Sequence, residues 1–383
     1  MIEGIQQAVG ERCELSGGML ILDESADEKS GESSAGAARQ HNGRLGKIEQ
    51  SQVGVYLAYA KEQVWTLVDG ELFVPEKWFD ASYAAKRARV GLPTDRVFQT
   101  KIALGWAMIQ RVQAQGLRFE GVAFDTLYGR SSWLREQCQQ AGIEYYADVP
   151  TNYPVYLEEP ELEWQHSKRG QASQHFQVVG QKPVTVADCG SSAATVWESL
   201  TLRACERGML TVDIARSLVW TVNRQGQVRQ ETLLIRRQGN DIRYSLSNAP
   251  QQTPLLTLAQ RQSQRHRVES SLQDAKSELG MDEFQATHYR AWEHHLALTI
   301  LASWFIAETR LDWSLEHPRD SSLLDDYDTD ALPTLSMANV RDLLRATLPL
   351  RQLSPQQAAV LVVQHLDNRT RSRRSRLRKH SGP

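Results

Sequence analysis

Apolar and polar residues alternate with strand-like spacing through the first part of the chain. Residues 19–23 (MLILD) form a short apolar run that ends on an acid, as a buried strand does. Residues 52–60 (QVGVYLAYA) place every second side chain on one apolar face, and residues 63–69 (QVWTLVD) form a third run. The polar, Gly- and Ser-rich stretch 27–47 is typical of a loop. This pattern predicts an antiparallel meander of three strands.

The period then changes to that of a helix. Apolar positions recur at helical spacing between residues 98 and 115, and a second helix is predicted over 129–142. Apolar runs at 119–125 (FEGVAFD) and 144–150 (EYYADVP) predict strands before and after that second helix. The order of three strands, helix, strand, helix, strand is that of an RNase H-like core, an α/β fold in which a mixed sheet carries helices on its faces.

The composition and the apolar pattern change again after residue 150. Residues 150–250 combine several prolines with short β-like runs, which predicts a separate β-rich unit inserted into the core. Beyond Pro254 the pattern is helical to about Leu279, and it is helical again from about 288 to 311. The last part of the core is therefore expected to be helical.

The C-terminal part reads as a helical extension. An acidic loop at 320–334 precedes two short predicted helices, at 337–348 and 355–367, which lead into a basic tail. The predicted domains are the first part of the core, the β-rich insertion, the last part of the core, and the helical extension with its basic tail: 1–149, 150–250, 251–315 and 316–383.

Composition excludes several classes of protein. A chain of 383 residues, 41% of them hydrophobic, is long and apolar enough for a sizeable core, which rules out wholesale disorder. Its four cysteines lie far apart with no CxxC pair, which disfavours a disulfide scaffold or zinc knuckle and fits a reducing cytoplasm. The longest apolar stretch, 296–307, has 12 residues against the roughly 20 of a membrane span. With no leader visible, we expect a cytoplasmic protein without membrane contact.

The formal net charge of −2 hides an asymmetry along the chain. Residues 369–379 hold six arginines and one lysine and no acid, so the preceding residues carry −9. A basic tail of this kind contacts nucleic acid in many proteins, and in others it is a disordered, solvated tail. Composition leaves both interpretations open.

The candidate chemistry lies at strand ends and on one late helix. Asp23 and Asp125 each end a predicted strand, where carboxylates of such a sheet can converge. On the predicted helix 261–280, Arg265, Glu269 and Lys276 are spaced by four and seven residues, within roughly 40° of one another around the helix axis. The alternative interpretation of that stripe is a solvated face with an i,i+4 ion pair, which contributes a few tenths of a kcal/mol.

The combination favours a metal site. Asp23, Asp125 and Glu269 fall on the first strand, the fourth strand and a late helix of one fold. Three carboxylates can hold two Mg²⁺ ions about 4 Å apart, with Mn²⁺ as a substitute, and such a pair serves phosphoryl transfer. Arg265 and Lys276, beside the glutamate, are then expected to bind the flanking phosphates.

The sequence resembles the bacterial insertion-sequence transposases of the DDE superfamily, in the group whose core is interrupted by a β-rich insertion. The resemblance runs from about residue 19 to the C-terminus, and together its pieces are specific. They are ILDESADEKSG, ARQHNGRLGK, QVGVYLAYA, FQTKIALGWAMIQ, AFDTLYGRSSWL, RYSLSNAP and RHRVESSLQDAKSELGMDEFQATHYRAWEHHLAL.

By that resemblance Asp23 and Asp125 match the two catalytic aspartates and Glu269 the catalytic glutamate. The group carries a Tyr, Arg, Glu, Lys signature on its last catalytic helix, which Arg265, Glu269 and Lys276 fit. Gln262 occupies the tyrosine position; it cannot stack on a base, though it can hydrogen-bond a phosphate.

Further basic residues are candidate DNA contacts. Lys29, Arg39 and Lys47 lie in the stretch after the first strand and match the family pattern, with a solvated loop as the alternative. Arg130 follows Asp125 closely enough to reach a phosphate, and Gly129 is expected to permit a tight turn.

The resemblance implies a transposase that cuts double-stranded DNA at terminal inverted repeats and joins the freed 3′-hydroxyl to target DNA. It also implies a nucleoid-associated protein that works as a homodimer on DNA. Only 18 residues precede the first strand, so we expect the end-recognition region of relatives to be absent or vestigial. One alternative is a silent derivative that binds DNA as a regulator or inhibitor. Another is an unrelated RNase H-like nuclease such as a junction resolvase, which the β-rich insertion disfavours.

Overall fold

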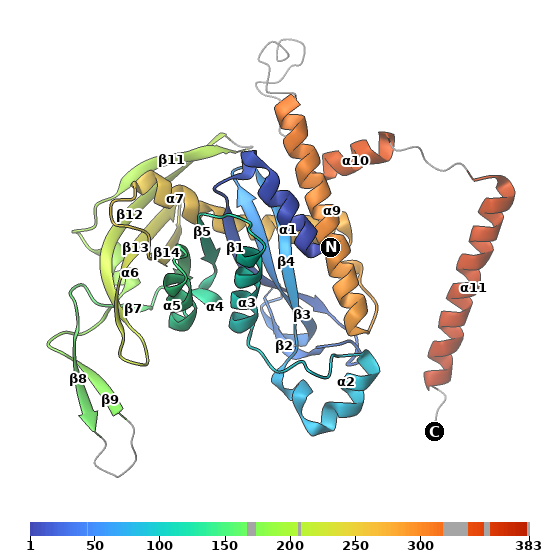
Figure 1. Ribbon diagram of the computed structural model, residues 1–383, viewed down its shortest axis with the longest axis horizontal. Coiled ribbons are helices and arrows are strands. Elements are labelled where there is room, and N and C mark those ends of the chain that lie inside the picture. Colours follow the sequence, from blue (N-terminus) through green and yellow to red (C-terminus); the bar gives the residue numbers. More distant parts are fainter. Residues whose placement is uncertain (44, 167–173, 206–207, 317–335, 348–352, 381–383) are drawn as a thin grey trace. The chain divides into compact units, whose positions relative to one another are not determined.

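The chain forms two compact units, Met1–Met337 and Ala338–Pro383. The computed structural model describes six ranges of residues (Figure 1): 1–43, 45–166, 174–205, 208–316, 336–347 and 353–380. The segment predicted as an acidic loop, 320–334, lies outside these ranges.

Five strands form the core of the sheet in the first unit. They are β1 (Met19–Glu28), β3 (Lys47–Lys61), β4 (Val64–Phe73), β5 (Gly121–Phe124) and β6 (Tyr145–Val149). β3 pairs antiparallel with both β1 and β4, whereas β1, β5 and β6 are parallel neighbours. Leu20, Ile21 and Leu22 of β1 are fully buried, as expected for a strand covered on both faces. This confirms the RNase H-like mixed sheet.

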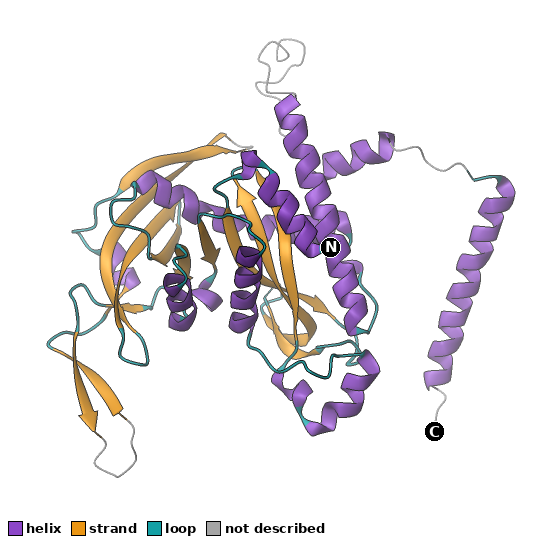
Figure 2. Cartoon of the chain, in the orientation of Figure 1, coloured by secondary structure: helices purple, strands orange, loops and turns teal. Residues whose placement is uncertain are grey.

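The β-rich insertion is continuous with that sheet (Figure 2). Its four long strands are antiparallel to one another: β11 (Glu198–Cys205), β12 (Gly208–Val222), β13 (Val228–Gln238) and β14 (Asp241–Ser247). β14 pairs with β6, so a ten-stranded sheet runs in the order β11-β12-β13-β14-β6-β5-β1-β3-β2, with β4 on β3. We expected a separate unit; the pairing with β6 is a long-range backbone contact that hydrophobic periodicity does not encode.

Smaller elements complete the insertion. A second apolar cluster, which includes Val155, Val186 and Ile235, packs against the inner strands. The remaining elements are β7 (Pro154–Val155), β8 (Glu161–His166), β9 (Gln174–Val179), β10 (Val184–Thr185) and α6 (Val186–Ser191). β8 and β9 form a two-stranded hairpin of their own, which projects from the sheet in Figure 1.

Helices cover both faces of the core sheet. α3 (Lys101–Ala114) packs on β3 and β4, and Gly105 lies so close to Leu22 that a Cβ would meet its Cδ2 at 2.5 Å. α8 (Arg267–Leu279) packs on β1, β3 and β4. Successive side chains of a strand point to opposite faces, so Leu22 faces α3 and its neighbour Asp23 faces the side of α8.

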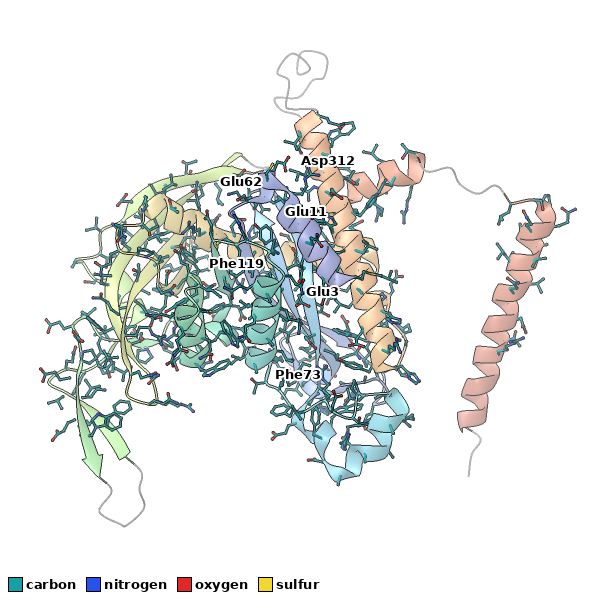
Figure 3. The ribbon with its side chains drawn as sticks, viewed as in Figure 1. Glu3, Glu11, Glu62, Phe73, Phe119 and Asp312 are labelled. Atoms are coloured by element: carbon teal, nitrogen blue, oxygen red, sulfur yellow. The ribbon has the colours of Figure 1, made fainter. Side chains whose placement is uncertain are left out.

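The long helix α9 (Tyr289–Glu316) packs along β4, and α1 (Ile2–Glu11) packs on α9. An ion pair of 2.5 Å joins Arg12 Nη2, just beyond α1, to Asp312 Oδ1 of α9; Figure 3 labels Asp312 with Glu3 and Glu11 of α1. Residues 296–307 lie within α9 and are buried on one side, although Leu298 and Phe305 are exposed. Among the helices of the described ranges, none has the length and hydropathy to cross a membrane.

Several local predictions were wrong. β1 continues through Glu28, and β2 (Ala38–Asn42) lies inside the stretch predicted as a loop. The predicted helix 261–280 is broken into the end of α7 (Leu255–Ser263), the 3₁₀ turn η4 (Gln264–His266) and α8.

In the second unit, α11 (Pro355–His380) continues as a helix through the basic segment, so the backbone there is not a disordered tail. The elements not yet named are η1 (Cys13–Leu15), η2 (Glu76–Phe79), η3 (Ala81–Tyr83), α2 (Ala84–Val90), α4 (Thr126–Gly129), α5 (Ser132–Gln140), η5 (Met281–Glu283) and α10 (Met337–Thr347).

Candidate active site

Three aspartates lie side by side where β5 and β6 reach their carboxyl ends, and Asp23 lies there in the middle of the longer strand β1. Leu22 of β1 is in register with Phe124 of β5, and Phe124 is in register with Ala147 of β6. The following residue is an aspartate in all three cases, so Asp23 within β1, Asp125 directly after β5 and Asp148 near the end of β6 lie at the same level. Because side-chain direction alternates along a strand, all three face the side covered by η4 and α8. The register therefore brings the two predicted aspartates together.

Arg265 lies among these carboxylates. Its Nη2 is 3.8 Å from Asp23 Oδ2 and its Nε is 3.8 Å from Asp148 Oδ2, while its Nη1 donates to Glu269 Oε1. The guanidinium is largely buried. Arg265 belongs to the η4 turn between α7 and α8. The predicted i,i+4 pair of Arg265 and Glu269 is therefore present, although the two residues do not share one helix.

Burial dominates the protonation of the three aspartates. It raises the pKa of Asp23 to about 7, an effect increased by the charge of Asp125 and opposed by Arg265. Burial likewise raises the pKa of Asp125 and that of Asp148, in both cases against the attraction of Arg265. Arg265 is the cation that offsets Asp23 and Asp125, whereas Arg236 and Arg243 also attract the carboxylate of Asp148.

The donors suit a hard divalent cation, because Mg²⁺ and Mn²⁺ prefer carboxylate oxygens. Of the three predicted carboxylates, Glu269 is the one whose side chain does not point toward the aspartates. Its side chain is 56% exposed and holds Arg265. In the described ranges, no three His, Cys, Asp or Glu residues are arranged as a ready metal-binding cluster. The chemistry of the donor set therefore fits a metal, and Glu269 would have to release Arg265 to join that set.

Asp125 also has a structural role. Its carboxylate caps the short helix α4, accepting from the backbone N–H groups of Leu127 at 3.0 Å and Tyr128 at 3.4 Å. α4 lies so close to β6 that a Cβ on Gly129 would sit 1.9 Å from the carbonyl oxygen of Asp148. Gly129 is therefore required for close approach, and not for the tight turn that we expected. The cap and the contact hold Asp125 beside Asp148.

The other acids near Asp23 are engaged elsewhere. Glu24 Oε1 pairs with Lys101 Nζ of α3 at 2.8 Å. Asp27 Oδ1 pairs with Lys276 Nζ at 3.3 Å. Lys276, predicted to bind phosphate, thus pairs with an acid of β1.

Gln262 is buried at the base of the site. Its Nε2 donates to Ser245 Oγ of β14 at 2.7 Å, and Ser245 Oγ donates to Asp148 Oδ1. The residue at the predicted tyrosine position therefore supports Asp148 through a serine of the insertion. A direct phosphate contact by Gln262 is untested and would require the amide to leave this position.

The structure does not bring the remaining basic candidates to the carboxylates. Lys29 Nζ donates to the carbonyl of Phe284 at 3.0 Å and lies over its ring. Arg39 and Lys47 are exposed on the β2–β3 hairpin, beyond the end of β1, and Lys47 pairs with Glu49 at 2.7 Å. Arg130 is exposed just after α4. All four remain predictions as DNA contacts.

Sequence reasoning missed Asp148. Its signal was the same as for the other two aspartates, an acid directly after a buried apolar run (YYAD). Ser245 had no signal, because its role depends on the pairing of β14 with β6.

A buried charge network joins the core to the insertion. Arg135 of α5 donates to Glu231 Oε1 of β13 at 2.9 Å and to the carbonyl of Gly129, and both charged side chains have no exposed surface. Glu231 also accepts from Tyr145 of β6 and Thr221 of β12. The network fixes the α4 turn, and with it Asp125, to the strands of the insertion.

Carboxylates at the strand ends of an RNase H-like sheet define a class of proteins, the metal-dependent nucleases and strand transferases. Comparison with protein families agrees: the family model described as DDE superfamily endonuclease matches residues 4–209, more than half of the chain. The chain belongs to this family. The match contains Asp23, Asp125 and Asp148 but ends before Glu269. No curated protein matches the chain.

Proposed function

We propose that this endonuclease is a DNA transposase, which cuts at the terminal inverted repeats of an element and joins the freed 3′-hydroxyl to target DNA. The observation that carries the proposal is the meeting of Asp23 and Asp125 on neighbouring strands, with Arg265 beside Asp23 and paired with Glu269. Asp23, Asp125 and Glu269 are the proposed ligands of two Mg²⁺ ions, for which Mn²⁺ would substitute. Bound divalent ions supply an activated hydroxyl nucleophile and a stabilised leaving oxygen.

The residues around the carboxylates have distinct proposed roles. Arg265 partly offsets the charges of Asp23 and Asp148, and it would bind the phosphate beside the cut if Glu269 served as a metal ligand. Asp148, held by Ser245, orients Arg265. Lys276 holds Asp27 until a phosphate competes for it.

The proposed partner is double-stranded DNA, both the element's ends and the target. Two ends must be cut and joined together, so we propose a homodimer assembled on DNA at the nucleoid. The exposed candidates Arg39, Lys47 and Arg130 are proposed as contacts outside the carboxylate site.

A strand-transfer assay tests the proposal. A labelled duplex that ends in the element's terminal repeat is incubated with supercoiled plasmid and Mg²⁺, and covalent joining is scored. Glu269→Gln is expected to reduce joining at least about 1000-fold, because the neutral amide is a poor Mg²⁺ ligand. The matched control Glu278→Gln, on the same helix, is expected to join at the parent rate.

Two outcomes would contradict the proposal. Strand joining that persists in Glu269→Gln would show that the glutamate is not part of the active site. Specific binding of the repeat by the parent, without a cleaved or joined product in Mg²⁺ or Mn²⁺, would instead favour the silent regulatory derivative.

A further inference from the structure

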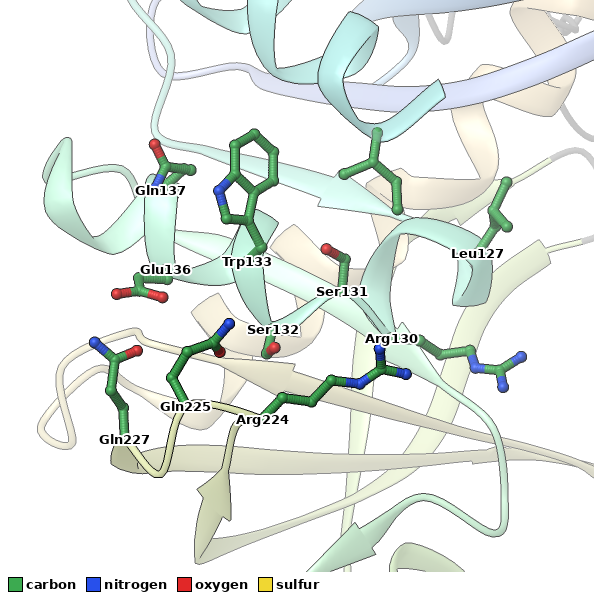
Figure 4. A pocket seen from close by; sticks show the side chains of 11 residues that line it. Leu127, Arg130, Ser131, Ser132, Trp133, Glu136, Gln137, Arg224, Gln225 and Gln227 are labelled. Atoms are coloured by element: carbon green, nitrogen blue, oxygen red, sulfur yellow. The ribbon is translucent and has the colours of Figure 1, made fainter. Parts of the chain in front are cut away.

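A pocket of about 680 Å³ opens beside the α4 turn that carries Asp125 (Figure 4). It is formed by α4, the first turns of α5 and the turn 223–227 between β12 and β13, so core and insertion each contribute one wall. None of the functions assigned above uses it, apart from Arg130 at its rim.

Two arginines give this pocket its charge. Arg130 lines it from the core and Arg224 from the insertion, and both are exposed. Within the described ranges, neither guanidinium has an ion pair or a hydrogen bond, in contrast to Arg265, Arg261 and Arg135 nearby in the fold. Glu136, the one acid in the lining, accepts from Gln140 Nε2 at 3.1 Å. The pocket therefore has cationic groups available for an anion such as a phosphate.

An exposed aromatic ring and a row of amides lie in the same pocket. Trp133, on α5, is 45% exposed although it lines a concave surface. Gln137, Gln225 and Gln227 also line the pocket, and each amide can both donate and accept hydrogen bonds. An indole face and amides suit the face and edges of a nucleic-acid base.

The insertion wall is held in place before any ligand binds. Asn223 Oδ1 accepts from the backbone N–H groups of Gln225 and Gln227, both at 2.9 Å. Trp164 packs so closely on Gly226 that a Cβ would lie 2.7 Å from its ring. Arg224 is therefore carried on a rigid turn that faces Arg130 and Trp133 across the pocket.

We propose that this pocket binds an unpaired stretch of a DNA strand, with a phosphate between Arg130 and Arg224 and a base on Trp133. The inference rests on the proposed function and names the form of DNA that the enzyme holds next to its carboxylates. An unpaired strand is the ligand that uses all three groups, because a duplex presents phosphates to a pocket but hides the faces of its bases.

Binding measurements without cleavage test this inference. The full chain is titrated, in EDTA, into a fluorescein-labelled single strand of about 10 nucleotides and into the matching duplex. Trp133→Ala is expected to weaken single-strand binding at least about fivefold and duplex binding much less, because stacking is lost. Trp133→Phe, which retains an aromatic face, is expected to restore most of it.

Arg224→Ala is expected to weaken single-strand binding and to reduce the salt slope by about 0.7, the amount for one phosphate contact. The matched controls are Arg118→Ala, an exposed arginine before β5, and Trp313→Ala, a similarly exposed indole on α9. Both are expected to bind like the parent. Unchanged unfolding midpoints for all five variants exclude a folding defect.

Three results would overturn the inference. They are a parent that does not bind the single strand, pocket variants that lose no more than the controls, and equal losses on single strand and duplex. None of them affects the proposed function, since Mg²⁺-dependent joining of duplex ends is measured separately and would persist.

Discussion

At the scale of single residues, the site combines acids that destabilise one another. Asp23 is buried beside Asp125, and Arg265 alone partly offsets their charge. Asp23, Asp125 and the pair of Arg265 and Glu269 could be singled out from sequence, because an acid after an apolar run and i,i+4 spacing are local signals. Asp148 had the same local signal but gained meaning only from the register of β5 and β6. The side-chain contacts of Gln262 and Lys276 could not be predicted, because both depend on strands far away in sequence.

A measurement of stability without metal tests the effect of burying the Asp23 carboxyl beside Asp125. The pKa of Asp23 rises from about 3.8 unfolded to about 7 folded, so the folded state binds the extra proton between those values. The Asp23 carboxyl therefore imposes no cost on folding below about pH 4. Its contribution lowers the free energy of unfolding as the pH rises to about 7. Asp23→Asn in EDTA is expected to raise the thermal midpoint at pH 8 by several degrees and to leave it unchanged near pH 4. A midpoint that falls at pH 8 would contradict this assignment.

At the scale of elements, the strands with strong alternation and the amphipathic helix α3 were predictable from periodicity alone. β2 was missed because its residues are polar and its pairing with β3 is at the end of the sheet. The break at η4 was missed because residues 261–280 keep a helical pattern across it. The joint between core and insertion, Arg135 with Glu231, had no sequence signal, since its partners lie 96 residues apart.

The Arg135–Glu231 joint gives a prediction for stability. Glu231→Gln leaves a buried guanidinium without its counter-charge, which is expected to cost about 3 to 5 kcal/mol of unfolding free energy. Asp241→Asn, which breaks the exposed pair with Arg243, is the control and is expected to cost below about 1 kcal/mol. Denaturant unfolding measures both. Equal costs for the two variants would show that the buried network does not fasten the insertion to the core.

At the scale of the whole molecule, the insertion lengthens the catalytic sheet and supplies part of the site. Ser245 of β14 holds Asp148, and Arg243 of β14 and Arg236 of β13 line one small cavity with that aspartate. The order of the core strands and helices was predictable because the spacing of apolar residues differs between strands and helices. The union of core and insertion in one sheet was not, because it rests on backbone pairing between β6 and β14. The net charge of −2 likewise conceals an acidic body and a basic end.

The basic end gives a prediction for DNA affinity. A variant that lacks residues 369–383 loses seven positive charges. If two or more of them meet phosphates, the slope of log affinity against log salt becomes shallower by at least about 2, at roughly 0.9 per contact. Anisotropy titrations on duplex DNA over a salt series measure the slope. An unchanged slope would mean that this segment of α11 is only solvated.

The most direct test of the central claim is the rate of Mg²⁺-dependent cleavage of repeat-bearing duplex DNA by Asp125→Asn. Asparagine keeps the helix cap of α4, since its side-chain oxygen still accepts from the backbone, but it removes the carboxylate charge. With unfolding and duplex binding unchanged, the rate is expected to fall at least about 1000-fold. Cleavage within a few-fold of the parent rate would contradict the claim that the strand-end carboxylates carry the chemistry.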